Sequence, residues 1–151
     1  GLGLGAEPAR RLAEEALDSG AGADKLRQLI QAQGGDARVV DQPERLPSAP
    51  ETLDVEAGEQ GYVGRLDCRA LGLAVRELGA GRERAEDAVD PAVGVELFVE
   101  RGSRVQKGQA LARIHAKDRE QAKTCAQALL AAVHLQQEPP EPSPLVLARI
   151  G

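Results

Sequence analysis

An alternation of apolar and polar residues makes the stretch from Asp90 to Ala116 the clearest pattern along the chain. Every second residue from Val93 to Val99 is a large aliphatic one, which is the spacing of a half-buried strand. A second alternating run covers residues 110–116. Between the two runs, Gly102 stands in a charged turn, where glycine allows the positive φ that tight turns need. The pattern predicts two strands of a β-rich element.

Apolar residues at helical spacing predict four helices. The first spans residues 8–17, and the second is capped by Asp24 and ends at the glycine pair 34–35. Two further helices are expected over residues 69–78 and 119–135. The apolar stripes of the first two helices need a partner surface, because short helices are marginal by themselves.

A proline-rich connector and short strands fill the rest of the pattern. The prolines between Asp36 and Thr52 predict an extended connector with a domain boundary, because proline fixes φ and removes a backbone donor. Strands are expected at residues 53–57, 61–67 and 145–150. The order after the connector is then β-β-α-β-β-α-β, which predicts an α+β domain.

The composition requires an aliphatic core and argues against two classes of partner. Tyr62 and Phe98 are the only aromatic residues. The net charge is −5, with acidic and basic residues interspersed. Nucleic-acid binding is therefore not expected, because phosphate contacts need clustered cations. No apolar run reaches the ~20 residues that a membrane span requires, so no membrane partner is expected either.

The start of the chain and its cysteines indicate the compartment. The chain opens on Gly1 rather than Met, which favours a fragment of a longer protein, and no secretory signal is visible. Cys68 and Cys125 are expected to be free, buried thiols, since two cysteines without an export signal are seldom bridged. These observations favour the cytoplasm.

Residues with catalytic or metal-binding chemistry are scarce. No serine or threonine stands in a nucleophile-elbow pattern. His115, at a strand end, and His134, near a helix end, lack ligands at metal-binding spacing. Cys125 stands among alanines at helical spacing, which is typical of a small core residue. We therefore predict no catalytic residue, no cofactor-binding residue and no metal ligand.

The glycine-rich segment from Gly79 to Arg82 superficially resembles a phosphate-binding loop. It follows a helix rather than a strand, and no helix begins after it, which is the reverse of the order in phosphate-binding motifs. The segment is therefore interpreted as a helix-ending loop. The carboxylates that follow lack calcium-loop spacing and are interpreted as a solvated charged loop; they are Glu83, Glu86, Asp87 and Asp90.

Six short pieces of sequence occur in one order over nearly the whole chain. They are residues 30–36 (IQAQGGD), 61–63 (GYV), 77–82 (ELGAGR), 90–95 (DPAVGV), 102–108 (GSRVQKG) and 114–116 (IHA). The series resembles the C-terminal third of the thymidine phosphorylase and pyrimidine-nucleoside phosphorylase family. Members of that family cleave a pyrimidine nucleoside with inorganic phosphate, giving free base and pentose 1-phosphate, and need no cofactor.

The resemblance implies a division of the chain. Residues 1–36 would be terminal helices of the family's large α/β catalytic domain, residues 37–45 a linker, and residues 46–151 the C-terminal α/β-hammerhead-like module. That module would be a mixed β-sheet with about two packed helices. The partner of the fragment would be the remainder of the parent chain, which binds phosphate and nucleoside and forms a homodimer through its helical domain.

The resemblance carries no catalytic residue onto this chain. The family's phosphate-binding and base-binding residues lie upstream of the matched region, so the fragment alone is expected to be inactive. The charged loop from Gly79 to Asp90 is hypothesised to take part in closure of the active-site cleft. Its candidate residues are Gly79, Gly81, Arg82 and Arg84.

Two other interpretations of the sequence are possible. The glycine spacing from Val99 to Leu111 also resembles half of a biotinyl or lipoyl carrier domain, in which a lysine on an exposed hairpin is modified. Here Lys107 lies in the wrong turn, and Lys117 ends a strand before a helix. A stand-alone interaction module without an enzymatic parent is the other alternative.

Overall fold

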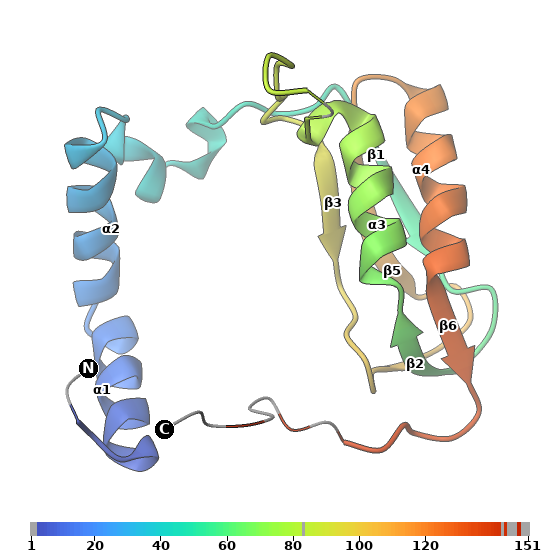
Figure 1. Cartoon of the computed structure of the whole chain (residues 1–151), viewed down its shortest axis with the longest axis horizontal. Coiled ribbons are helices and arrows are strands. Elements are labelled where there is room, and N and C mark those ends of the chain that lie inside the picture. Colours follow the sequence, from blue (N-terminus) through green and yellow to red (C-terminus); the bar gives the residue numbers. More distant parts are fainter. Residues whose placement is uncertain (1–2, 83, 143, 145–147, 149–151) are drawn as a thin grey trace. The chain divides into compact units, whose positions relative to one another are not determined.

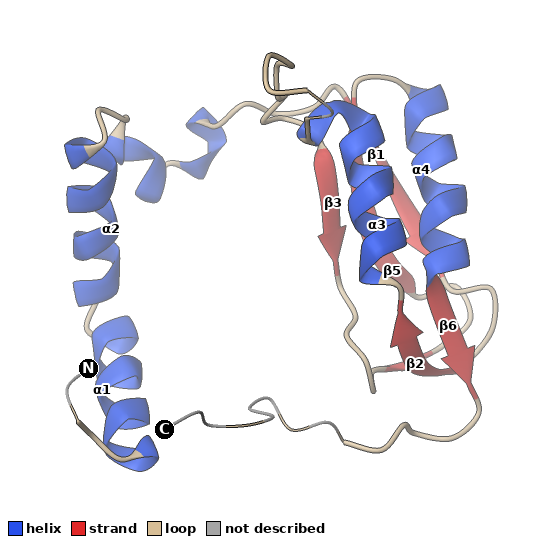
Figure 2. Ribbon diagram, in the orientation of Figure 1, coloured by secondary structure: helices blue, strands red, loops and turns tan. Residues whose placement is uncertain are grey.

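The computed structural model describes residues 3–82, 84–142, 144 and 148. The strand expected at residues 145–150 falls, apart from Ala148, outside the described residues. The chain divides into two compact units, residues 1–47 and residues 48–151. Figure 1 and Figure 2 show the elements of each unit, which are taken one unit at a time below.

The first unit consists of short helices. Two α-helices, α1 (Ala6–Asp18) and α2 (Ala21–Ala32), are followed by two 3₁₀ turns, η1 (Ala37–Val40) and η2 (Pro43–Arg45). The prolines of the connector therefore do not exclude regular structure, because Pro43 occupies the first turn of η2, where its missing N–H costs nothing.

The start of α2 differs from the prediction. The helix begins at Ala21, and its N-cap is Gly20 with φ 79°, so Asp24 lies inside the first turn instead of capping it. There the Asp24 carboxylate accepts a hydrogen bond from Nη1 of Arg27 at 2.7 Å. Neither α1 nor α2 contains a buried residue. Leu17 is 75% exposed, so the apolar stripes of these helices remain uncovered in the described unit.

The second unit contains two antiparallel three-stranded sheets. One has the order β1 (Glu51–Glu56), β5 (Ala110–Ala116), β3 (Gly94–Leu97). The other has the order β4 (Arg104–Val105), β2 (Gly61–Leu66), β6 (Val133–Gln136). The two alternating runs within residues 90–116 thus contribute the antiparallel pair β3–β5, as expected. The short β4 stands between them in sequence and pairs with β2 of the other sheet.

Two helices cover the first sheet. The helix α3 (Cys68–Val75) runs on into a single π turn (Arg76–Ala80) and lies beside α4 (Arg119–Ala132), as Figure 2 shows. Both helices begin where the sequence supplies a capping carboxylate. Asp67 accepts from the amide of Ala70 at 3.0 Å, and Asp118 accepts from the amide of Gln121 at 2.9 Å.

The end of α4 is the main correction to the predicted helices. The helix stops at Ala132, and residues 133–136 form β6 instead of a last helical turn. Val133 pairs with Leu66 and Leu135 pairs with Val63, so these apolar residues follow the two-residue spacing of a strand. The order of the unit is therefore β-β-α-β-β-β-α-β, and the predicted α+β class is confirmed.

The core of the second unit is aliphatic, as the composition requires. Its largest fully buried side chains are Leu111, Ile114, Leu129, Val63 and Val105. Phe98 is 44% exposed, so the core contains no phenylalanine. Burial of these aliphatic side chains, at about 25 cal/mol per Å² of apolar surface, is the main stabilising contribution of the unit.

Candidate functional site

The charged loop between α3 and β3, residues 79–90, begins at a helix-ending glycine. Gly79 adopts φ 101°, inside the π turn that follows α3. Residues with a Cβ rarely adopt this conformation, so a glycine here ends the helix and turns the chain away from it. The interpretation of this segment as a helix-ending loop is confirmed.

The two ends of the loop are joined at its base. The amide of Asp90 donates a hydrogen bond of 2.9 Å to the carbonyl oxygen of Gly79. Oδ1 of Asp90 accepts from the amide of Ala92 at 2.9 Å. Oδ2 of Asp90 lies 3.5 Å from Nζ of Lys117, which belongs to the corner between β5 and α4. Three separate parts of the chain therefore meet at Asp90.

The described part of the loop between these ends presents charges of both signs to solvent, the arginines Arg82 and Arg84 and the carboxylate of Glu86. A turn is formed by the amide of Arg84, which donates to Oδ2 of Asp87 at 2.8 Å, and by the amide of Asp87, which donates to the carbonyl of Arg84 at 3.1 Å. The side chains of Arg82 and Arg84 are exposed. Glu83, one of the four carboxylates singled out in the sequence, lies outside the described residues. Exposed guanidinium groups on a loop are suited to binding an anion.

The two histidines lie in different sheets. His115 is in β5, opposite Thr52 of β1 and Gly94 of β3. His134 lies just after the end of α4, as expected, within β6, and its Nε2 lies 3.0 Å from Nη2 of Arg65. Among the described residues, no group of three or more His, Cys, Asp and Glu side chains could hold a metal ion.

The two cysteines are free thiols in different surroundings. Cys125 is 4% exposed on the inner face of α4, as predicted for a small core residue. Burial, and then the charge of Glu77, raises the pKa of the Cys125 thiol. Cys68 was expected to be buried, and that expectation is wrong. It is the first residue of α3 and is exposed, and its Sγ lies 3.8 Å from the carbonyl oxygen of Leu66.

A groove of about 330 Å³ runs between α3 and α4. Its floor is apolar, and two carboxylates, those of Glu77 and Glu120, lie among its lining residues. The full lining is Ala74, Glu77, Leu78, Glu120, Gln121, Thr124 and Cys125. The thiol of Cys125, with its raised pKa, is a poor nucleophile here, because the thiolate is the reactive form. The groove could not be read from the sequence, because it forms only where the two helices pack.

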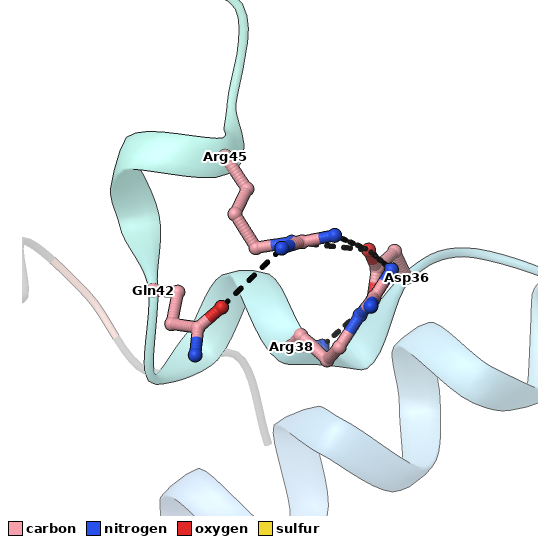
Figure 3. A network of polar contacts seen from close by, with 4 residues as sticks. All are labelled: Asp36, Arg38, Gln42 and Arg45. Atoms are coloured by element: carbon pink, nitrogen blue, oxygen red, sulfur yellow. Dashed lines mark hydrogen bonds and ion pairs between the residues drawn. The ribbon is translucent and has the colours of Figure 1, made fainter.

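A polar network that the sequence analysis did not single out lies in the first unit, after α2. Figure 3 shows Asp36 accepting hydrogen bonds from Arg38 and Arg45. Arg38 donates from its amide at 3.0 Å, from Nε at 2.8 Å and from Nη2 at 2.7 Å. Hydrogen bonds from Arg38, more than the charge of Arg45, lower the pKa of the Asp36 carboxyl well below its usual value. The network holds η1 and η2 together and keeps the Asp36 carboxylate occupied by two arginines.

None of the described helices combines the length and the apolar character that crossing a membrane requires. Lys117, one of the two lysines considered for a carrier domain, has its ammonium group next to Asp90. Lys107 lies in the turn between β4 and β5. Neither lysine stands at the tip of a hairpin of the kind a carrier domain displays.

The second unit belongs to a known class of C-terminal module. Residues 62–136 match the family described as "Pyrimidine nucleoside phosphorylase C-terminal domain". The match covers β2 to β6 and includes the whole loop 79–90. The chain belongs to the thymidine and pyrimidine-nucleoside phosphorylase family, as its C-terminal portion, which confirms the resemblance drawn from its short motifs.

Curated relatives extend the similarity beyond the matched domain. A thymidine phosphorylase of Burkholderia orbicola (strain MC0-3) is 45% identical over 130 residues, which is 85% of this chain and 30% of the relative. A pyrimidine-nucleoside phosphorylase of Staphylococcus aureus (strain bovine RF122 / ET3-1) is 45% identical over 109 residues, 72% of this chain and 25% of the relative. The chain thus spans about 30% or less of the length of these relatives.

Proposed function

We propose that this chain is the C-terminal part of an enzyme that cleaves pyrimidine nucleosides with inorganic phosphate, giving free base and pentose 1-phosphate. The observation that carries the proposal is the match of residues 62–136 to the family's C-terminal domain. The names of the relatives, thymidine phosphorylase and pyrimidine-nucleoside phosphorylase, support the same reaction. The chain itself is structural in this proposal, apart from the loop 79–90, and the groups that carry out the chemistry belong to the remainder of the parent chain.

The partner of this chain is, in this proposal, the remainder of its own parent chain, which binds the two substrates and forms a homodimer. Residues 1–36 contribute terminal helices to the large α/β catalytic domain, residues 37–45 link them, and residues 46–151 form the hammerhead-like module. The exposed apolar stripes of α1 and α2 support this division, because such stripes need a covering surface. The two free thiols are compatible with the cytoplasm as the compartment.

The test is an assay of base release from thymidine and from uridine, with and without inorganic phosphate. The complete protein that contains this chain is expected to release base only when phosphate is present. The 151-residue chain alone is expected to release none from either nucleoside. A complete protein that leaves both nucleosides intact in the presence of phosphate would contradict the proposal.

We further propose that the loop 79–90 closes over the bound substrates through Arg82 and Arg84, with Gly79 and Gly81 as its hinge. Both arginines are exposed, and the loop leaves α3 at the positive φ of Gly79. In the complete protein, Arg82→Ala and Arg84→Ala are expected to raise KM for phosphate or nucleoside by about tenfold. The estimate corresponds to losing one hydrogen bond to a charged group, about 1.4 kcal/mol.

A matched control is Arg69→Ala, which removes an exposed arginine from α3, at the opposite end of the helix from the loop. This variant is expected to keep the parent KM for both substrates. If Arg82→Ala and Arg84→Ala also keep the parent KM and kcat, the loop has no part in closure. The assignment of the reaction itself would stand in that case, because it rests on base release by the complete protein.

A further inference from the structure

We infer that Lys117 is a positioning residue, which together with Asp90 latches both ends of the loop 79–90 to the corner between β5 and α4. The latch fixes where the loop leaves and rejoins the domain, so that Arg82 and Arg84 move from a constant base. The inference rests on the proposed function in one respect, which is that the loop closes over a ligand. The geometry of the latch stands independently of that role.

Asp90 is the centre of the latch because each of its polar groups holds a different segment. Its amide is bonded to the carbonyl of Gly79 at 2.9 Å, where the loop starts. Its Oδ1 accepts from the amide of Ala92 at 2.9 Å, which fixes the chain as it approaches β3. Its Oδ2 lies 3.5 Å from the ammonium of Lys117. The carboxylate therefore ties the far end of the loop to a separate element.

Lys117 contacts the near end of the loop as well. A Cβ built on Gly79 would lie 3.3 Å from Nζ of Lys117 and 4.0 Å from its Cε. The lysine side chain thus occupies the space above Gly79 that the absence of a side chain leaves open. Gly79 is favoured here by its positive φ of 101°, and a side chain at this position would in addition displace the end of the lysine by a few tenths of an ångström.

The corner that carries Lys117 is itself rigid. Ala116, the preceding residue, is 0% exposed at the end of β5. Asp118, the following residue, caps α4 through its bond to the amide of Gln121. The side chain of Asp90 is 29% exposed and that of Lys117 is 52% exposed, so the pair is partly shielded from solvent. A lysine held by a buried strand end and a capped helix is a suitable anchor for a mobile segment.

Breaking the latch is expected to widen the range of positions that the loop samples. Closure over a ligand would then start from a broader ensemble, and a larger loss of conformational entropy on closing weakens binding. KM is therefore expected to rise in a Lys117→Met variant, whereas kcat changes little, because the chemistry is carried by the rest of the protein. Lys117→Arg retains the charge and is expected to restore the parent KM.

Limited proteolysis of the complete protein measures the latch without reference to activity. Trypsin cleaves after arginine, and Arg82 and Arg84 both lie inside the loop. Cleavage there tracks the population of open loop when opening is fast relative to cleavage. Lys117→Met is expected to raise the rate of cleavage after Arg82 or Arg84 by about two- to fivefold, the range that loss of a modest ion pair produces.

The matched control is Lys123→Met on α4. Lys123 also forms an exposed ion pair, with Glu120 at 2.7 Å, but this pair does not touch the loop. The control is expected to keep the parent rate of loop cleavage, and so is Lys117→Arg. Cleavage after Arg113, in the middle of β5, reports global unfolding in every variant.

Two results would overturn the latch. One is a Lys117→Met variant whose loop is cleaved no faster than that of Lys123→Met. The other is cleavage after Arg113 that rises by the same factor as cleavage in the loop, which would mean general destabilisation. Faster loop cleavage with an unchanged KM would overturn the positioning role. Unchanged KM in the loop arginine variants, together with faster cleavage in Lys117→Met, would contradict closure while the latch itself stands.

Discussion

Arg113 on β5 binds Asp54 on β1 with both arms of its guanidinium group. Nε donates to Oδ1 at 2.7 Å and Nη2 donates to Oδ2 at 2.9 Å, across a register in which these two residues are directly paired. On the other side of β5, Glu96 of β3 pairs with Arg113, and the guanidinium lies 5.8 Å from the ring centre of Phe98. One arginine therefore binds a side chain of β1 and lies over the ring of Phe98, the residue that follows β3.

This pair predicts a pH dependence of stability. The hydrogen bonds from Arg113, followed by its charge, lower the pKa of the Asp54 carboxyl in the folded chain. A group whose pKa is lower in the folded state stabilises the fold above its unfolded pKa, which is about 3.9 for aspartate, and loses that effect as the pH falls through the folded value. Asp54→Asn is therefore expected to lower the free energy of unfolding at pH 7, with the difference from the parent shrinking below about pH 4.

Urea denaturation at pH 7, 5 and 3 measures this difference. Glu51→Gln is a suitable control, because it removes an exposed carboxylate from the same strand β1. The control is expected to change stability little at any of the three pH values. A difference between Asp54→Asn and the parent that stays constant from pH 7 to pH 3 would contradict the assignment.

Leu129 and Leu130 are neighbours on α4 with opposite surroundings. Leu129 is 0% exposed and belongs to the core, whereas Leu130 is 47% exposed. Leu129→Ala is expected to lower the free energy of unfolding by about 2–5 kcal/mol, because it removes buried methyl groups and leaves a cavity. Leu130→Ala is expected to cost less than about 1 kcal/mol. Similar losses for both variants in urea denaturation would mean that α4 does not pack as described.

The sequence indicated an element best where apolar residues followed one spacing, helical or strand-like, and a capping residue stood at its start. Both conditions hold for α4, whose start follows Asp118 and whose inner positions include Ala122, Cys125 and Leu129. Its end was misplaced because Val133 and Leu135 fit a helical stripe and a strand equally well. Pairing with β2 decides between the two, and that pairing joins residues about 70 positions apart.

The candidate site was predictable only in part, for a similar reason. Gly79 signalled the end of α3 from its residue type alone, because a glycine after an apolar stripe is a common helix stop. The contacts of Asp90 with Gly79 and Lys117 depend on how β3 and β5 lie beside α3, which no local pattern encodes. The start of α2 was missed because Gly20 has no capping side chain to mark it.

Substitution by alanine is expected to affect stability differently at Gly61 and at Gly58. A Cβ at Gly61 would lie 2.9 Å from the backbone oxygen of Gln136 on β6, so the strand would have to move. Gly61→Ala is expected to destabilise the fold by about 1–3 kcal/mol. A Cβ at Gly58, in the turn between β1 and β2, would meet no atom within 4 Å. Gly58→Ala is expected to stay within about 0.5 kcal/mol of the parent. Urea denaturation of both variants checks the packing of β2 against β6, and a tolerated Gly61→Ala would contradict it.

The two thiols predict a two-step reaction with a thiol reagent such as 5,5′-dithiobis(2-nitrobenzoate). Cys68 is exposed at the start of α3, whereas Cys125 is 4% exposed and has a raised pKa because it is buried near Glu77. The thiolate is the reactive species, so both access and ionisation slow the reaction of Cys125. In the 151-residue chain one thiol is expected to react at once, and the second about tenfold more slowly or only in denaturant.

Cys68→Ser is expected to abolish the fast step and Cys125→Ser the slow one. Equal rates for the two thiols in the absence of denaturant would show that α4 does not shield Cys125, and a fast step that survives Cys68→Ser would show that Cys125 is the exposed thiol.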